Sequence, residues 1–396
     1  MKLLLIADGR SPITQRWIKA IAPFGARVLL VSTFPCAPIP GAELVAVLPV
    51  AFARQSGSQA GTGSGNSFKK KLISALRPTL AFLRHQLGPY TLGGYQKKLL
   101  DLIHTLQPDV VHALRIPYEG MLASVTPTRI PLLISTWGND LTLHANASTL
   151  MGRLTRQTLL RADGLLSDTA IDVTRAAEWG FDPAKPSLVV VGNGGLDQEE
   201  LQEAVKDVKP ANPPQIINPR GIRSYVRTDT FFQAIPLVLK RHPQVQFVCT
   251  SMANQKEALD WVEKLGIAAN VRLLGYLNQH ELWQETARSL ASVSVSTHDG
   301  TPNTLLEAMA LGCLPICGDL PSIREWITPG QNGLLVPADD PSALADAICT
   351  GIEDAALRNS AAELNKTKIG QNAALASTRS KIADFYTQFL LQIPRA

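Results

Sequence analysis

Short apolar runs rich in β-branched residues alternate with stretches of helical periodicity, and this alternation restricts the fold more than any other feature. Residues 2–7 and 27–32 form two such runs, and residues 15–21 between them have apolar residues at helical spacing. This order predicts a parallel sheet covered by helices, because parallel neighbours need a crossover connection. The order recurs after residue 215. We therefore predict an α/β chain with two doubly wound parallel sheets, whose ligands bind at the carboxyl ends of the strands.

The length and one polar stretch predict the domain boundaries. With 396 residues, the chain is long enough for about two domains. Residues 198–215 are charged and then rich in proline (KPANPPQ), a composition typical of an exposed connection. We predict an N-terminal domain over residues 1–197 and a C-terminal domain over residues 216–375, joined by this linker.

The composition argues against two classes of protein. Hydrophobic residues make up 45% of the chain and charged residues 18%, values typical of a folded globular protein rather than a disordered scaffold. The net charge of +5 is small, and no basic motif is interleaved with aromatic residues. We therefore expect no nucleic-acid partner.

The cysteines and the N-terminus indicate a reducing compartment. The five cysteines are odd in number and lie scattered in mostly apolar segments: Cys36, Cys249, Cys313, Cys317 and Cys349. This distribution is typical of reduced core residues, and no histidine or second cysteine pair completes a metal site. The sequence has neither a recognisable signal peptide nor an apolar run of about 20 residues. We expect a cytoplasmic protein, either free or peripheral at the inner face of the cytoplasmic membrane.

Residues 296–325 (STHDGTPNTLLEAMALGCLPICGDLPSIRE) contain the strongest local signal of a ligand site. Thr301 suits the N-cap of a helix, Pro302 its first position and Gly312 its end, which predicts a helix over residues 301–311. A helix N-terminus offers free amides and the positive end of the helix dipole, so it favours a phosphate. The residues predicted to form this phosphate site are Gly300, Thr301, Pro302, Asn303 and Thr304.

Two carboxylates belong to the same segment. Asp299 precedes the predicted helix, and Glu307 lies in its second turn, eight positions later. Beside an amide-lined anion site, two carboxylates suit a phosphate bonded to sugars, because they accept hydrogen bonds from sugar hydroxyls. The alternative is that Asp299 caps the loop and Glu307 is an ordinary charge on a helix surface.

Three arginines follow the first predicted strand of the C-terminal domain. Arg220, Arg223 and Arg227 lie between a strand that ends at Asn218 and a helix that starts near Asp229. Guanidinium groups donate parallel hydrogen bonds to phosphate oxygens, so three of them at the end of a strand are candidates to hold a diphosphate. Solvated surface arginines are the alternative.

The residues of this region resemble the signature of family 4 retaining glycosyltransferases of the GT-B fold. The family pattern is Glu, seven residues, Glu, and this chain departs from it with Asp299 at the first position. Besides Asp299 and Glu307 within LLEAMALG, the similarity includes Gly318, Asp319, Arg324 and Glu325. The resemblance implies two Rossmann-like domains that face a cleft, with a C-terminal helix over residues 376–396 packed back on the N-terminal domain.

The resemblance also implies roles for single residues. Glu307 would bond the nucleotide ribose, Asp299 would contact hydroxyls of the donor sugar, and Arg220 matches the arginine of the family. These three are the predicted catalytic residues. The lysine of the family is absent, and one of the two later arginines, Arg223 or Arg227, would take its task. Tyr276 lies where relatives hold the base, and it would stack on that base.

The N-terminal half supplies the predicted acceptor side. Three loops, over residues 8–14, after His112 and over residues 136–140, should open at one edge of the sheet. The candidate acceptor-side residues are Gly9, Ser11, His112, Trp137, Asn139 and Asp140. His112 is equally interpretable as a strand residue satisfied by the backbone, and Asn139 and Asp140 as caps of a following helix.

Residues 55–87 carry a further signal. Residues 55–67 bury too little apolar surface to order themselves, which predicts a mobile loop. Residues 68–87 combine leucines on one side with lysines and arginines on the other, the pattern of a basic amphipathic helix. Two interpretations are open: the helix packs on the sheet, or it contacts an anionic membrane surface.

The resemblance implies a retaining transfer of a sugar from a nucleotide-diphosphate donor, a UDP-sugar in first place, to a hydroxyl of a glycan or lipid-linked glycan. Such a reaction belongs to polysaccharide or cell-envelope glycan synthesis. No metal cofactor is expected, because arginine and helix amides neutralise the diphosphate. The alternatives are a nucleotide-sugar epimerase of the same fold and a catalytically silent nucleotide-sugar-binding subunit.

Overall fold

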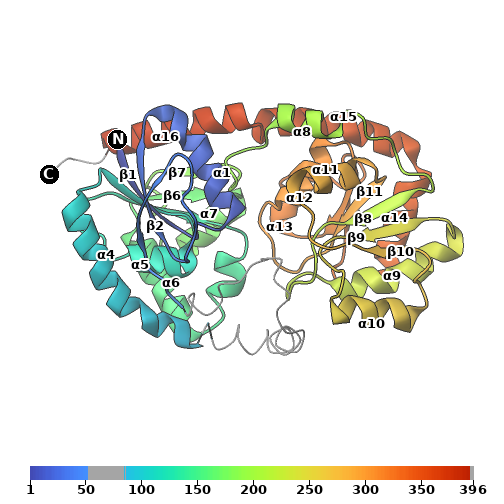
Figure 1. Cartoon of the computed structure of the whole chain (residues 1–396), viewed down its shortest axis with the longest axis horizontal. Helices are drawn as coiled ribbons and strands as arrows, with labels where there is room; N and C mark the ends of the chain where they lie inside the picture. The colour runs from blue at the N-terminus through green and yellow to red at the C-terminus, as the bar shows by residue number, and fades with distance from the viewer. Residues whose placement is uncertain (52–83, 85, 393–396) are drawn as a thin grey trace. The chain divides into compact units, whose positions relative to one another are not determined.

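The computed structural model of the chain describes residues 1–51, 84 and 86–392 (Figure 1). The chain divides into two compact units. Unit 1 comprises Met1–Gly194 and Thr378–Ala396, and unit 2 comprises Gly195–Ser377. Each unit contains one parallel sheet covered by helices, as the alternation of apolar runs predicts.

Unit 1 is built on a seven-stranded parallel sheet of order β3-β2-β1-β4-β5-β6-β7. Its strands are β1 (Lys2–Ala7), β2 (Arg27–Ser32), β3 (Glu43–Val47), β4 (Val110–Ala113), β5 (Leu132–Thr136), β6 (Gly164–Ser167) and β7 (Ser187–Val189). Its helices are α1 (Pro12–Ile21), α4 (Leu92–Leu106), α5 (Met121–Ala123), α6 (Thr149–Arg161), α7 (Ala170–Glu178) and most of α16 (Leu375–Gln392). Short helical turns are η1 (Ala22–Phe24), η2 (Gly88–Thr91), η3 (Ile116–Gly120) and η4 (Asp140–His144).

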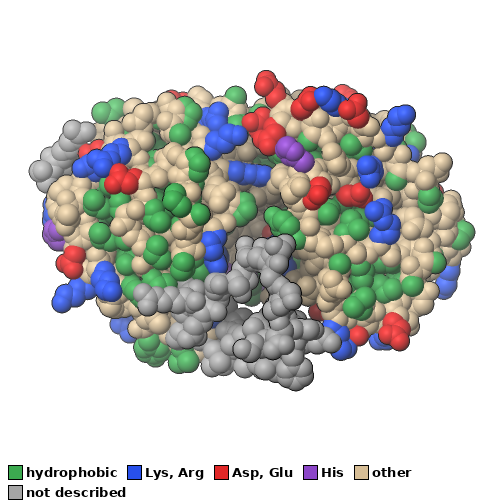
Figure 2. All heavy atoms as spheres, viewed as in Figure 1, with side chains coloured by type: hydrophobic (Ala, Val, Ile, Leu, Met, Phe, Trp, Pro, Cys, Tyr) green, Lys and Arg blue, Asp and Glu red, His purple; other side chains and the backbone are tan. Residues whose placement is uncertain are grey.

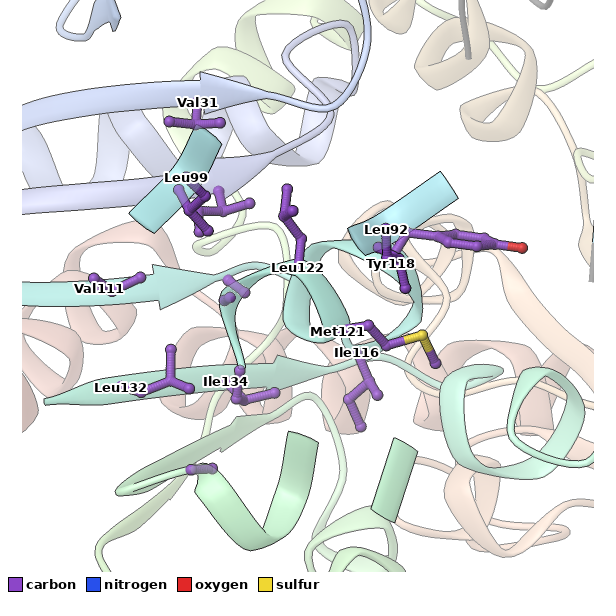
Figure 3. Close-up of a cluster of buried hydrophobic side chains, with 14 of the residues drawn as sticks. Val31, Leu92, Leu99, Val111, Ile116, Tyr118, Met121, Leu122, Leu132 and Ile134 are labelled. Carbon is purple, nitrogen blue, oxygen red and sulfur yellow. The ribbon is translucent and has the colours of Figure 1, made fainter. Parts of the chain in front are cut away.

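Strand β1 shows why both faces of this sheet are covered. Leu4 and Ile6 belong to one buried cluster, and Leu3 and Leu5 belong to another, because side chains alternate along a strand. The first cluster includes residues of α4, α5 and α6; in Figure 3, Val111, Leu132 and Ile134 from the sheet and Leu122 from α5 belong to it. The second cluster includes residues of α1 and α16.

Unit 2 is built on a six-stranded parallel sheet of order β10-β9-β8-β11-β12-β13. Its strands are β8 (Gln215–Asn218), β9 (Gln246–Cys249), β10 (Val271–Leu273), β11 (Ala291–Ser294), β12 (Leu314–Gly318) and β13 (Leu334–Val336). Its helices are α8 (Gln198–Val205), α9 (Thr228–Arg241), α10 (Lys256–Leu265), α11 (Gln279–Ala287), α12 (Asn303–Ala310), α13 (Pro321–Arg324), α14 (Pro341–Glu353) and α15 (Ala355–Asn372).

Both sheets share one topology. In each, the first strand lies in the interior of the sheet, with the next two strands on one side and the later strands on the other. The direction of winding therefore changes between β1 and β4 in unit 1, and between β8 and β11 in unit 2. Ligands of doubly wound sheets bind at the carboxyl ends of the strands at such a switch point.

The predicted linker over residues 198–215 is wrong in its first half. Residues 198–205 form helix α8, because Asp197 accepts a hydrogen bond from the Glu200 amide (3.2 Å) and the following residues favour helix. The helix packs on α11, where Gln284 Nε2 donates to the Ala204 carbonyl (3.1 Å). The charge of this stretch therefore belongs to the solvent side of a packed helix.

The predicted mobile loop over residues 55–67 and most of the predicted basic helix over residues 68–87 lie outside the described residues, so the membrane interpretation stays a prediction. Within the described part of the chain, none of the helices has the length and apolarity to cross a bilayer. On the face seen in Figure 2, acidic and basic side chains are interspersed.

Candidate functional site

In unit 2, hydrogen bonds tie together the loops that follow β8 and β11. Asn218 Oδ1 accepts from the Arg220 amide (3.1 Å), which turns the chain immediately after β8. Further along this loop, Val226 forms an antiparallel bridge with Ser296, and the Thr297 amide donates to the Tyr225 carbonyl (2.9 Å). The loops on both sides of the switch point are thus held together by hydrogen bonds.

Arg220 and Asp299 form an ion pair at this switch point. Arg220 Nη2 lies 2.8 Å from Asp299 Oδ2, although the angles are not those of a hydrogen bond. The side chains are 7% and 12% exposed, so the pair is largely removed from water. The structure therefore brings together the predicted arginine and the first predicted carboxylate, which are 79 positions apart in the sequence.

Helix α12 starts two residues later than predicted. It begins at Asn303, and its N-cap residue, Pro302, makes no side-chain hydrogen bond to the first amides. Thr301, the predicted N-cap, lies one position before the observed N-cap, and its hydroxyl accepts a hydrogen bond from Trp326 Nε1 (2.9 Å). The hydroxyl of Thr304 is buried in the first turn and has no partner among the described residues. The uncapped N-terminus keeps the property on which the anion-site prediction depends.

Glu307 is not an ordinary charge on a helix surface. The residue is 3% exposed, and its Oε1 accepts a hydrogen bond from Gln279 Nε2 of helix α11 (3.0 Å). Burying a carboxylate costs free energy unless polar partners compensate. The interpretation of Glu307 as a solvated helix residue is therefore wrong.

Gly318 at the end of β12 fixes the position of the neighbouring loop. A Cβ at this position would lie 2.7 Å from the Ser296 carbonyl oxygen and 3.0 Å from its nitrogen. Only glycine allows this approach of two backbones. The loop that leads to Asp299 is thus held from two sides, by β12 and by the loop after β8.

The other two arginines have different surroundings from those predicted. Arg227 donates through Nε and Nη2 to the two carboxylate oxygens of Asp229, both at 2.8 Å, which raises the pKa of Arg227 and lowers the pKa of Asp229. Arg223 is exposed and contacts the Arg220 carbonyl and the Tyr225 hydroxyl. Of the three predicted arginines, only Arg220 therefore takes part in the buried ion pair. Tyr276 is 81% exposed on the loop after β10.

In unit 1, a pocket of about 340 Å³ lies at the switch point between β1 and β4. Of the predicted acceptor-side residues, Ser11 and Trp137 line it. Ser11 also caps α1, where its hydroxyl accepts from the Ile13 amide (3.3 Å). Sequence reasoning missed most of the lining, which includes Arg10, Phe34, Arg84, Arg115, Tyr118 and Glu119.

His112 and Asp140 are structural residues. His112 is fully buried in β4, with Nδ1 2.6 Å from the Tyr386 hydroxyl and Nε2 2.8 Å from Ser135 Oγ, so its partners are side chains and not the predicted backbone. Burial lowers the pKa of His112 to about 3, which keeps the ring neutral. Asp140 is fully buried and accepts from Arg115 Nη2 (2.9 Å) and the Ile116 amide (3.0 Å).

Neither of the two remaining acceptor-side residues, Gly9 and Asn139, lines the pocket. A Cβ at Gly9 would lie 2.5 Å from Cys36 Sγ, so this glycine allows close packing of the loop after β1. Asn139 is the N-cap of η4 without a side-chain capping bond, and its buried Oδ1 has no partner among the described residues. Asn139 thus lies at the cap position that the alternative interpretation gave it, although its side chain makes no capping bond.

Strain and burial are concentrated around Tyr118 and Glu119. Tyr118 has φ 67° and ψ −51°, a region that residues with a Cβ rarely adopt. Glu119 is 4% exposed, and Thr33 Oγ1 donates to its Oε1 (2.9 Å). Burial raises the pKa of Glu119 to about 7, although the charge of Arg115 acts in the opposite direction. A strained residue next to a carboxyl that titrates near neutrality is typical of a functional pocket.

Comparison with known proteins relates both halves of the chain to glycosyltransferases. Residues 2–169 match the family described as Glycosyl transferase 4-like, and residues 197–368 match the family described as Glycosyl transferases group 1. A crystal structure of Anabaena Alr3699/HepE in complex with UDP-glucose shares the fold, with a TM-score of 0.70 over 98% of this chain and 100% of that chain, at 16% identity. The predicted GT-B architecture is confirmed, and each half of the chain matches a glycosyltransferase family model.

Two curated relatives match this chain over only part of their own length. The "Exopolysaccharide phosphotransferase SCO2592" of Streptomyces coelicolor is 26% identical over 267 residues, which are 66% of this chain and 26% of that protein. The "Phosphatidyl-myo-inositol mannosyltransferase" of Mycolicibacterium smegmatis is 30% identical over 128 residues, 32% of each chain. The matched part of this chain thus spans about a quarter to a third of these relatives.

Within the described residues, no group of three histidine, cysteine, aspartate or glutamate side chains is arranged to hold a metal ion. The expectation of a metal-independent reaction is not tested by this finding and stays a prediction.

Proposed function

We propose that this chain is a retaining glycosyltransferase that moves a sugar from a nucleoside-diphosphate donor, bound by unit 2, to a hydroxyl of a glycan or lipid-linked glycan. The observation that carries the proposal is the buried Arg220–Asp299 pair at the switch point of unit 2, in the same segment as the uncapped N-terminus of α12 and the buried Glu307. Cation, amides and carboxylates together match the parts of such a donor.

Each part of the donor has a proposed partner. The amides of α12 and the guanidinium of Arg220 bind the diphosphate and neutralise the charge that grows on it when the sugar leaves. Glu307 accepts hydrogen bonds from the ribose, and Asp299 accepts them from hydroxyls of the donor sugar. The ion pair with Asp299 holds the Arg220 guanidinium in place before the donor enters, which reduces the entropic cost of binding.

The transfer itself requires no protein nucleophile. The bond between the anomeric carbon and the phosphate oxygen breaks, the acceptor oxygen bonds to the same face of the sugar, and its proton goes to an oxygen of the leaving phosphate. The protein contributes position and charge stabilisation.

The donor base and the acceptor class are supported by relatives. A UDP-sugar is the first candidate, because the GT-B neighbour from Anabaena was crystallised with UDP-glucose. A lipid-linked acceptor is proposed because one relative is named for transfer of mannose to phosphatidyl-myo-inositol. We further propose that the reaction runs without a metal ion and serves the synthesis of polysaccharide or cell-envelope glycan.

A transfer assay tests the proposal. UDP- and GDP-sugars are incubated with the protein and a bacterial lipid and glycan extract, with and without EDTA, and products are analysed by mass spectrometry and by NMR for the anomeric configuration. We expect acceptor-dependent turnover with retained configuration, unaffected by EDTA and lost in Asp299→Ala. Asp346→Ala, which removes an exposed carboxylate paired with Arg241, is the matched control and should keep turnover. An altered donor sugar released without acceptor would instead identify an epimerase.

A further inference from the structure

The pocket of unit 1 combines guanidinium groups with aromatic rings. The Arg10 guanidinium lies 3.6 Å from the centre of the Phe34 ring. The Arg84 guanidinium lies 5.7 Å from the same ring and 5.0 Å from the Tyr118 ring. Stacking on an aromatic face fixes a guanidinium while its N–H groups stay available for a ligand. The four segments that supply these residues are distant in sequence, so the fold itself assembles the group.

The charges of the pocket are only partly compensated. Arg10 forms an ion pair with Asp8 (3.1 Å), and Arg115 forms one with the buried Asp140 (2.9 Å). For Arg84, no ion pair with a described carboxylate is found, and its Nε is buried without a hydrogen-bond partner among the described residues. A buried N–H of a charged group without a partner costs free energy, and a bound anion would supply that partner.

Glu119 cancels this positive charge only in part near neutral pH. Its raised pKa of about 7 leaves a large fraction of the carboxyl protonated, and a protonated carboxyl can donate a hydrogen bond to an anion. The groups that face Glu119 are the guanidinium groups of Arg84 and Arg115 and the hydroxyl of Thr33.

The backbone around Tyr118 maintains this arrangement. The Tyr118 hydroxyl donates to the Arg84 carbonyl (2.8 Å), and a Cβ at Gly88 would lie 2.9 Å from the same hydroxyl. The strained φ of Tyr118 therefore places its ring against the segment that carries Arg84. In Figure 3 the Tyr118 ring points away from the buried strand residues Val111 and Leu132.

We propose that this pocket binds an anionic group of the acceptor, a phosphate or a carboxylate, between Arg84 and Arg10, with Glu119 as an additional hydrogen-bonding partner. The proposal rests on the proposed glycosyltransferase function and specifies its acceptor. The same chemistry has two sources: the phosphate of a lipid carrier and the carboxylate of an acidic glycan. Arg84 and Arg10 then select a charged acceptor over a neutral sugar, while Phe34 and Tyr118 contact its apolar faces.

Calorimetric titration of the full chain tests the proposal with two matched pairs of probes. Octyl phosphate is compared with octyl glucoside, and methyl glucuronide with methyl glucoside. We expect one anionic probe to bind at least about tenfold more tightly than its neutral counterpart, since a hydrogen bond to a charged group contributes that much or more. Tighter binding of octyl phosphate identifies a lipid phosphate, and tighter binding of methyl glucuronide identifies an acidic glycan.

Three variants locate the site. Arg84→Gln and Arg10→Gln should each weaken the preferred anionic probe by about tenfold or more, and Arg227→Gln in unit 2, the control, should not. Equal affinity for charged and neutral probes overturns the proposal, and so does the absence of binding by both anionic probes. The proposal is also overturned if Arg84→Gln is folded, as judged by circular dichroism, and binds the anionic probe with wild-type affinity. Nucleotide binding is measured on the same samples. If a nucleotide binds and the anionic probes do not, only the acceptor proposal fails. If no nucleotide binds to the wild type, the proposed function is contradicted.

Discussion

The two units have the same strand order around their switch points, but different sets of side chains gather there. In unit 2, a buried ion pair and an uncapped helix N-terminus stand at the switch point, and most of the groups come from one continuous segment. In unit 1, the corresponding place is a pocket lined by stacked arginines, a strained tyrosine and a buried carboxyl, drawn from several distant segments. The sheet topology thus determines where a site forms, and the loops determine what it binds.

The largest expected effect comes from breaking the ion pair of unit 2. Arg220→Met leaves Asp299 buried without its cation, which should lower the free energy of unfolding by about 3 kcal/mol and abolish donor binding. Urea denaturation and nucleotide titration measure the two effects. The double variant Arg220→Met/Asp299→Leu should recover part of the stability but not the binding. If Arg220→Met is as stable as the wild type, the pair is not a buried one.

Unit 1 should respond to pH through Glu119. Because the folded pKa of Glu119, about 7, lies above its usual value of 4.5, the folded state binds this proton more tightly, and stability from this group falls as pH rises from 4.5 to 7. Glu119→Gln should remove the loss, with a relative gain on the order of 3 kcal/mol above pH 7 and none below pH 4.5. Urea denaturation across this pH range measures it, with Glu363→Gln on the surface of α15 as control. A pH-independent difference would show that Glu119 does not titrate as stated.

The buried His112 should give unit 1 the opposite dependence at lower pH. Its folded pKa of about 3 lies below its usual value of 6.5, so the unfolded state takes up the proton first and stability falls as pH falls. Between pH 7 and 5 the expected loss is about 2 kcal/mol. His112→Gln should not show this loss, whereas His280→Gln on the surface of unit 2 should keep it. Equal pH slopes for both variants would contradict the assignment.

The smallest effect is expected at Arg227. Its pair with Asp229 is about one-third exposed, so Arg227→Ala should change the free energy of unfolding by less than about 1 kcal/mol. Donor affinity should also stay within about twofold, because the guanidinium is engaged on the surface. A tenfold loss of nucleotide affinity would instead indicate that Arg227 binds the diphosphate, as the sequence predicted.

The sequence predicted the fold well because the fold depends on local patterns. Strand β1 spans the predicted residues 2–7, and β2 spans the predicted residues 27–32. Asp299 and Glu307 were predicted together for the same reason, since one short segment contains both. The signal for the Arg227–Asp229 pair was also local, two residues apart, but was interpreted as a ligand site.

The pocket of unit 1 could not be predicted from local patterns. Phe34, Arg84 and Glu119 are brought together only by the strand order and by a backbone conformation at Tyr118 that no sequence rule predicts. Likewise, the sequence of β4 does not predict that His112 contacts Tyr386, which belongs to helix α16. Long-range packing decides these positions.

The most direct test of the central claim, that unit 2 binds a nucleotide at its switch point, is thermal stabilisation by UDP, GDP, ADP, CMP and dTDP and their sugars. The proteins are the wild type, Glu307→Gln and the control Glu363→Gln. A nucleotide at about a hundred times its dissociation constant adds about 2.7 kcal/mol to stability. We predict that one nucleotide stabilises the wild type and the control equally, and Glu307→Gln clearly less. Failure of every nucleotide to stabilise the folded wild type, or equal stabilisation of Glu307→Gln, would contradict the account.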